Sequence, residues 1–321
     1  MKRNTMAIVG ALLCCSCYQD IDLEKYRGEE TAVLNCIANS DTIVMADISR
    51  TWFFTDKRPS EDITGLDVEI YVNGGFKGLM QYDGDKYLSE TMLRHGDTIT
   101  VKTIVDGKEL SATDLMPPKT EIEGIGITYK QVSSGSNNMF VTPDGEIITS
   151  DTNDEFTYHI RFKNIPGEKR YYFLNIDVAD QRNIPGMFDY SYDPVFQLTS
   201  ERINKSLTNM KIEGQQGLPF SNEGITGSEY SITIRETINP LSDIIFENWG
   251  ERTVTLYSIS EAYYRYVISL LANDSDHSLQ GGLADFGISE PVKIYSNITG
   301  GTGILGCITS TSQYVDLSEH K

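Results

Sequence analysis

The stretch Phe156-Thr157-Tyr158-His159-Ile160-Arg161-Phe162 alternates large apolar side chains with polar ones. Because successive side chains of a β-strand point to opposite faces, this period predicts a strand with one face in an apolar core. Val68-Glu69-Ile70-Tyr71-Val72 has the same period, and the Asn73-Gly74-Gly75 that follows supplies the positive backbone angles of a tight turn. These stretches predict a mainly β protein.

Strand-like runs and turn residues follow one another closely from residue 31 to residue 116. This spacing predicts an N-terminal immunoglobulin-like β-sandwich module, although the Cys-Trp-Cys signature of true immunoglobulin domains is missing. Met116-Pro117-Pro118 interrupts the pattern, because prolines remove backbone donors and favour an extended segment. We therefore expect a boundary there and a larger C-terminal β-rich domain over 117–321. Its further expected strands are Tyr171–Ala179, Tyr230–Arg235, Thr253–Ile259 and Val292–Ile298.

One packed helix is expected in the second domain, near 259–272. Its apolar and aromatic residues fall on one face at helical spacing, which favours packing on a sheet over a ligand site. Ser258 and Glu261 have the spacing of a capping box, Ser260 is an alternative cap, and Asn273 can end the helix.

The first residues are typical of a secreted, membrane-tethered chain. Lys2 and Arg3 precede an apolar run of signal-peptide length, which ends in Cys14-Cys15-Ser16-Cys17. A small residue followed by Cys at this place resembles the lipobox of bacterial lipoproteins, in which the peptidase cuts before the Cys and the Cys carries the lipids. We predict a signal peptide over 1–16, lipidation of Cys17, and an anchor with an acidic linker over 17–30. Cleavage before Cys14 or Cys15, and an ordinary secretory signal, are the alternatives.

The chain is strongly acidic, with 46 Asp and Glu against 27 Lys and Arg and a formal net charge of −19. This charge argues against nucleic acid as a partner and against a folded body lying on anionic lipid. Beyond the signal region no apolar run approaches the length of a transmembrane helix. We therefore expect the chain to lie on a membrane through its anchor without crossing it.

No residue pattern indicates catalysis, a cofactor or a metal centre, so we predict a protein that is not an enzyme. None of the four His has a His or Cys partner at metal-ligand spacing, and neither a Gly-x-Ser-x-Gly elbow nor a phosphate-binding loop is present. The acid clusters 151–155 and 273–276 have oxygen ligands suited to calcium, but polar turns explain them equally well. Gly300-Gly301-Thr302-Gly303 predicts a tight turn between strands. Cys36 and Cys307 lie in apolar strand patterns, which favours buried free thiols over a disulfide.

The long stretch 180–227 has a weak pattern and contains a group of aromatic residues. Aromatic side chains crowded into a loop often form a recognition surface. We therefore predict a contact loop, with coverage of the core edge as an equal alternative. Its candidate residues are Met187, Phe188, Tyr190, Tyr192 and Phe196.

Several stretches, in this order, together resemble the DUF4249 family of Bacteroidota outer-membrane lipoproteins. They are the lipobox at Cys17, Ala32–Ile37, Ala112–Pro117, Asp193–Phe196, Phe220–Glu223 with Gly227, Ser260–Leu271, Tyr295–Ile298, Gly300-Gly301 and Gly303–Gly306.

Members of this family are often encoded beside TonB-dependent transporters. The resemblance implies a non-catalytic accessory or binding lipoprotein that is associated with such a nutrient transporter at the outer membrane. The acids after Cys17 partly resemble an export signal, which implies a position facing the cell surface. A structural or adhesive surface lipoprotein is the first alternative, and a surface hydrolase is the second.

Overall fold

The computed structural model describes residues 27–53, 56, 63–142, 144–178, 186–203, 211–212, 215–242, 248–273 and 293–321. The expected signal peptide and Cys17 lie outside these residues. The strands are β1 (Ala32–Asn39), β2 (Val44–Arg50), β3 (Glu69–Val72), β4 (Gly75–Leu79), β5 (Gln81–Tyr82), β6 (Tyr87–Ser89), β7 (Thr98–Val105), β8 (Lys108–Leu115), β9 (Ile122–Val141), β10 (Ile147–Lys163), β11 (Tyr171–Val178), β12 (Met187–Asp189), β13 (Lys211–Ile212), β14 (Gln215–Ser221), β15 (Glu229–Ile238), β16 (Glu251–Ile259) and β17 (Thr302–Asp316). The helices are α2 (Pro194–Ile203), α4 (Glu261–Asn273) and the 3₁₀ helix η3 (Leu317–His320).

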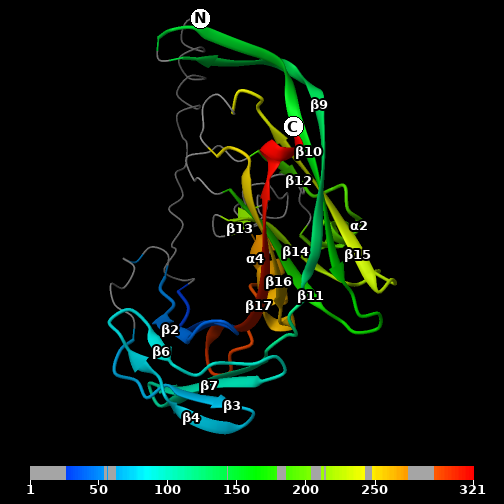
Figure 1. The fold of residues 1–321 in the computed structure, drawn as a ribbon. Coiled ribbons are helices and arrows are strands. Elements are labelled where there is room, and N and C mark those ends of the chain that lie inside the picture. Colours follow the sequence, from blue (N-terminus) through cyan, green and yellow to red (C-terminus); the bar gives the residue numbers. More distant parts are fainter. Residues whose placement is uncertain are drawn as a thin grey trace, which may run out of the picture.

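The mainly β class is confirmed, and the strands form three sheets (Figure 1). A nine-stranded sheet has the order β13-β14-β11-β16-β17-β1-β2-β6-β5. A four-stranded sheet, β4-β3-β7-β8, covers its N-terminal part, and another, β12-β15-β10-β9, covers its C-terminal part. Each covered part encloses an apolar core, so the molecule contains two sandwiches that share one sheet.

The last strand, β17, belongs to both sandwiches. Its first half pairs in parallel with β1, and its second half pairs antiparallel with β16. A glycine-rich turn leads into β17, and its glycines let β17 approach β1 closely. A Cβ at Gly303 would lie only 2.2 Å from the carbonyl oxygen of Leu34, so a larger residue would not fit there. Gly300 has the positive φ of the expected turn, +80°.

The expected immunoglobulin-like module is not confirmed, because the N-terminal sandwich is completed by a strand from the end of the chain. Its core contains Leu305 and Cys307 from β17 beside residues of the first 116. Residues 116–120 have no regular secondary structure. The proposed boundary at this point stays a prediction.

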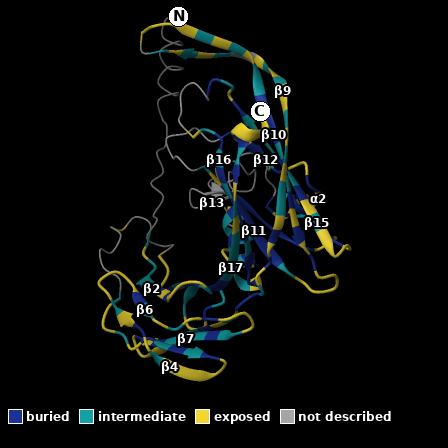
Figure 2. Cartoon of the chain, viewed as in Figure 1, coloured by how far each residue is buried: buried dark blue, intermediate teal, exposed yellow. Residues whose placement is uncertain are grey.

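The alternation that predicted the strands is visible in the burial pattern (Figure 2). Phe156, Tyr158, Ile160 and Phe162 of β10 are all fully buried in the larger core. In the smaller core Val68, Ile70 and Val72 are buried. Asn73 and Gly74 form the predicted turn, with φ of 53° and 77°.

The predicted helix is α4, and Ser260 is its cap. The Ser260 hydroxyl accepts hydrogen bonds from the backbone N–H groups of Tyr263 (3.3 Å) and Cys307 (3.2 Å), which ties the start of the helix to β17. Tyr264, Val267 and Leu271 form its buried face.

A second helix, α2, was not expected from the sequence. Asp193 caps it by accepting from the N–H of Val195 at 3.0 Å, and Pro194 occupies its first position, where no N–H is needed. The strand expected over 292–298 is wrong for residues 293–298, which are not assigned to any strand.

Candidate functional site

The predicted contact loop is mostly interior. Phe188, Tyr190 and Phe196 are 0% exposed and pack in the larger core, so the expectation that they form a contact surface is wrong. Their burial follows from secondary structure, because β12 pairs with β15 and directs Phe188 inward, while α2 buries Phe196. Met187 and Tyr192 remain exposed, at 50% and 46%.

The part of the molecule that reaches outward is instead the β9–β10 ribbon. These strands are 20 and 17 residues long. β10 pairs with β15 only from Asp154 to Lys163, so the part of the ribbon beyond Asp154 is two strands wide among the described residues. The register shifts between Ser150 and Thr152, and Figure 1 shows the ribbon extending beyond the body, with its outer part bent to one side.

The tip of this ribbon is apolar. Met139, Val141 and Ile147 are 64%, 52% and 61% exposed. Val141 pairs with Ile147, so their side chains lie together on one face of the ribbon. Pro143-Asp144-Gly145 between these residues is the turn signal in the sequence by which the hairpin could have been found. We call Met139, Val141 and Ile147 the ribbon tip.

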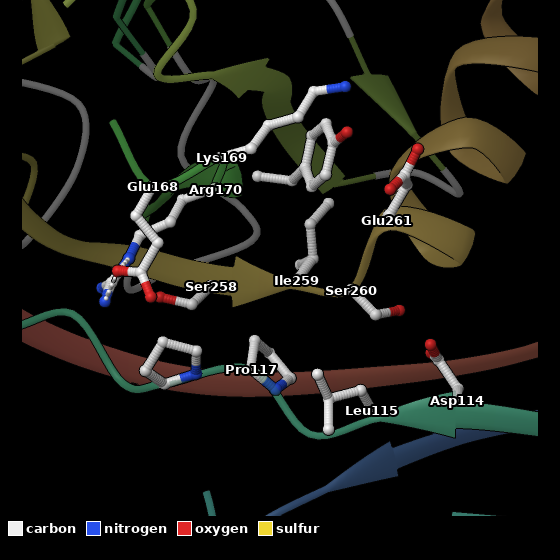
Figure 3. Close-up of a pocket in the computed structure, with 12 residues that line it drawn as sticks. Asp114, Leu115, Pro117, Glu168, Lys169, Arg170, Ser258, Ile259, Ser260 and Glu261 are labelled. Carbon is white, nitrogen blue, oxygen red and sulfur yellow. Dashed lines mark hydrogen bonds and ion pairs between the residues drawn. The ribbon is translucent and has the colours of Figure 1, made fainter. Parts of the chain in front are cut away.

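A cavity of about 370 Å³ lies where the two sandwiches meet (Figure 3). Asp114, Leu115 and the two prolines line it from the end of β8, and residues of β16, α4 and the segment before β11 line it from the other side. On one flank Arg170 pairs with Glu168 at 2.6 Å. Its lining therefore mixes carboxylates, hydroxyls and cations, and can hydrogen-bond a small polar molecule.

Asp114, which lines this cavity, has a raised pKa. Its Oδ2 is buried and has no hydrogen-bond partner among the described residues. Burial raises the pKa of Asp114 to about 6, although Ser260 and Cys307 beside the carboxyl oppose the shift. This carboxyl can therefore hold a proton closer to neutral pH than an ordinary aspartate.

Cys36 and Cys307 are free and buried, as predicted. They lie on the neighbouring parallel strands β1 and β17, where Ala38 is the register partner of Cys307. Burial raises the pKa of Cys36 to about 12 and that of Cys307 well above its usual value. Thiols in this state are poor nucleophiles.

Two members of the first acid cluster pair with cations. Asp154 pairs with Lys321 at 2.8 Å, and Glu155 pairs with Lys130 at 2.9 Å. Within the described part of the chain no group of three or more His, Cys, Asp or Glu residues is arranged to hold a metal ion. The second cluster, 273–276, lies outside the described residues except for Asn273.

The family follows from a comparison with known domain families. Residues 19–314 match the model of a domain of unknown function, DUF4249. The chain belongs to the DUF4249 family. A search of curated proteins finds no match. In the portion of this family member that the structure describes, no helix is long and apolar enough to cross a membrane.

Proposed function

We propose that this DUF4249 protein is a non-catalytic accessory lipoprotein, anchored through Cys17, that docks on a TonB-dependent outer-membrane transporter and helps it to capture a nutrient. The sequence of the first 17 residues and the family membership support the setting. The single observation that carries the docking is the exposed apolar ribbon tip.

The ribbon tip has the properties of a protein contact. It presents large apolar side chains to solvent, although exposed apolar groups in a soluble body are normally scattered. The strands beside it have backbone edges that a partner strand can pair with. A lipid anchor would confine the protein to the membrane in which the transporter lies and raise their effective concentration, so a small contact suffices.

Co-purification from native membranes in mild detergent tests this proposal. The triple variant Met139→Ser, Val141→Ser, Ile147→Ser should lose the transporter while its folded body remains intact by circular dichroism. A matched control replaces Leu79 and Ile104, which are also exposed at 44% and 64% on the N-terminal sandwich. The control should retain the transporter. Equal recovery of a transporter with both variants, or with neither, contradicts docking through the ribbon tip.

A further inference from the structure

A second hollow, of about 870 Å³, lies far from the ribbon tip in sequence and is built from three segments of the chain. One face of α4 contributes residues between Tyr264 and Ala272, the segment 293–302 contributes the facing residues, and Arg202 comes from α2. We call this hollow the α4 groove. We infer that it binds an organic carboxylate, which goes beyond the docking function and does not depend on it.

The charge of the α4 groove is opposite to that of the chain. Arg202, Arg265 and Lys293 line it, and none of its described lining residues is acidic, in a chain with 46 acidic and 27 basic residues. Arg202 is partly neutralised by Glu223 at 2.9 Å. Arg265 and Lys293 form no ion pair in the described part of the chain. Among the described residues, two cations thus face one hollow without a counter-charge, which favours an anion there.

Arg265 is placed to recognise a planar anion. Its guanidinium carbon lies 4.2 Å from the centre of the Tyr295 ring. A guanidinium held against an aromatic ring keeps N–H donors along its edge, and these match the two oxygens of a carboxylate. Lys293, two residues before Tyr295, adds a point charge from the same wall.

The two walls are fixed before any ligand arrives. The Ser269 hydroxyl accepts from the N–H of Tyr295 at 2.8 Å and donates to the carbonyl of Tyr266 at 2.7 Å. The amide of Asn297 makes two hydrogen bonds with the backbone of Leu305, at 2.8 and 3.0 Å. The segment 293–298 is therefore tied to α4 and to β17, and a preorganised site loses less entropy on binding.

The apolar residues that line the α4 groove determine what the rest of the ligand, beyond its carboxylate, should be. Ile268 and Ala272 of α4 face the groove together with Ile294 and Ile298. An inorganic ion would leave these side chains without a partner, whereas a ring or carbon chain covers them. The groove therefore fits a ring-bearing carboxylate better than a bare anion.

Titration calorimetry with paired probes tests the inference on the purified protein. Benzoate and glucuronate carry the carboxylate on an apolar and a polar ring, and benzyl alcohol and glucose are their neutral counterparts. Inorganic phosphate tests charge alone. We expect at least one of the two carboxylates to bind, to weaken as ionic strength rises, and to exceed its neutral counterpart by tenfold or more.

The variants locate the site. Arg265→Gln and Lys293→Gln should each weaken the bound carboxylate at least fivefold. Lys102→Gln is the control, because Lys102 also lies over an aromatic ring, 5.7 Å from that of Tyr71, but outside the groove. It should change nothing. Absence of carboxylate binding, equal binding of the neutral counterpart, binding of phosphate alone, or unchanged affinity in Arg265→Gln would overturn the inference.

Discussion

Glu236 and Arg252 form an ion pair buried between the two sheets of the larger sandwich. Nη2 of Arg252 lies 2.7 Å from Oε1 of Glu236, and the side chains are 1% and 0% exposed. Glu236 comes from β15 and Arg252 from β16, so the pair joins the C-terminal four-stranded sheet to the nine-stranded sheet. Tyr158 donates to Glu236 at 2.5 Å, and Arg252 donates to the carbonyl of Trp249 at 2.8 Å.

Removing one partner of this pair should strongly destabilise the protein. Arg252→Met leaves the Glu236 carboxylate buried without its cation, which typically costs about 3–5 kcal/mol. Urea unfolding followed by tryptophan fluorescence measures the loss. The control is Lys163→Met, which breaks the exposed Lys163–Glu123 pair and should cost less than about 1 kcal/mol. Similar losses in the two variants would contradict the structural importance of the buried pair.

Asp114 gives the stability a definite pH dependence. Its pKa is about 6 in the folded protein against an ordinary 3.8, so the folded state binds the proton more tightly than the unfolded state. This contribution is fully present below about pH 4 and is lost as the pH rises through about 6.

Asp114→Asn, which cannot ionise, should therefore be more stable than the wild type at pH 8, by up to about 3 kcal/mol. The gain should shrink toward pH 4. Asp97→Asn is the control and should change the stability in the opposite direction, making the protein less stable than the wild type at pH 8. The reason is that hydrogen bonds from the Arg94 backbone and from Asn73 lower the pKa of Asp97. Unfolding midpoints from pH 4 to 8 test both. A gain for Asp114→Asn that does not change with pH would contradict this assignment.

The buried thiols of Cys36 and Cys307 should be unreactive toward alkylating reagents in the folded protein. Burial raises their pKa values, so little thiolate forms near neutral pH. Iodoacetamide at pH 8, followed by mass mapping, should modify Cys36 and Cys307 only after denaturant is added. Rapid modification of either cysteine without denaturant would contradict this prediction and would show that the paired strands β1 and β17 separate readily.

Cys17 should carry the lipid anchor. Cells grown with an alkyne fatty acid should label the wild-type protein but not Cys17→Ala, while Cys14→Ala and Cys15→Ala should keep the label. Equal labelling of wild type and Cys17→Ala would place the lipid elsewhere.

The local sequence pattern predicted the strands well, because a strand with one buried face alternates apolar and polar residues. The run from Phe156 to Phe162 and the turn at Asn73 are of this kind. The α2 helix had readable signals in Asp193 and Pro194, but the weak periodicity of 180–227 favoured a loop. The burial of Phe188 depends on the pairing of β12 with β15, which is distant in sequence, so the local pattern did not show it.

Features that depend on distant pairing were not accessible. β17 joins both sandwiches because its first half pairs with β1, near the other end of the chain, and its second half pairs with β16, the preceding strand. The α4 groove likewise unites Arg202, Arg265 and Lys293 from three segments. One sequence shows each cation but not their convergence, whereas the ribbon tip was marked by Pro143-Asp144-Gly145.

The most direct test of the account is photo-cross-linking from the ribbon tip in living cells. A benzophenone amino acid in place of Met139, which is 64% exposed, should yield on irradiation one dominant adduct with a TonB-dependent transporter. The same amino acid at Ile104, equally exposed on β7, should not. A transporter adduct from Met139 alone is the predicted result. Adducts that are the same from both positions, or none from Met139 to any transporter, would contradict docking through the ribbon.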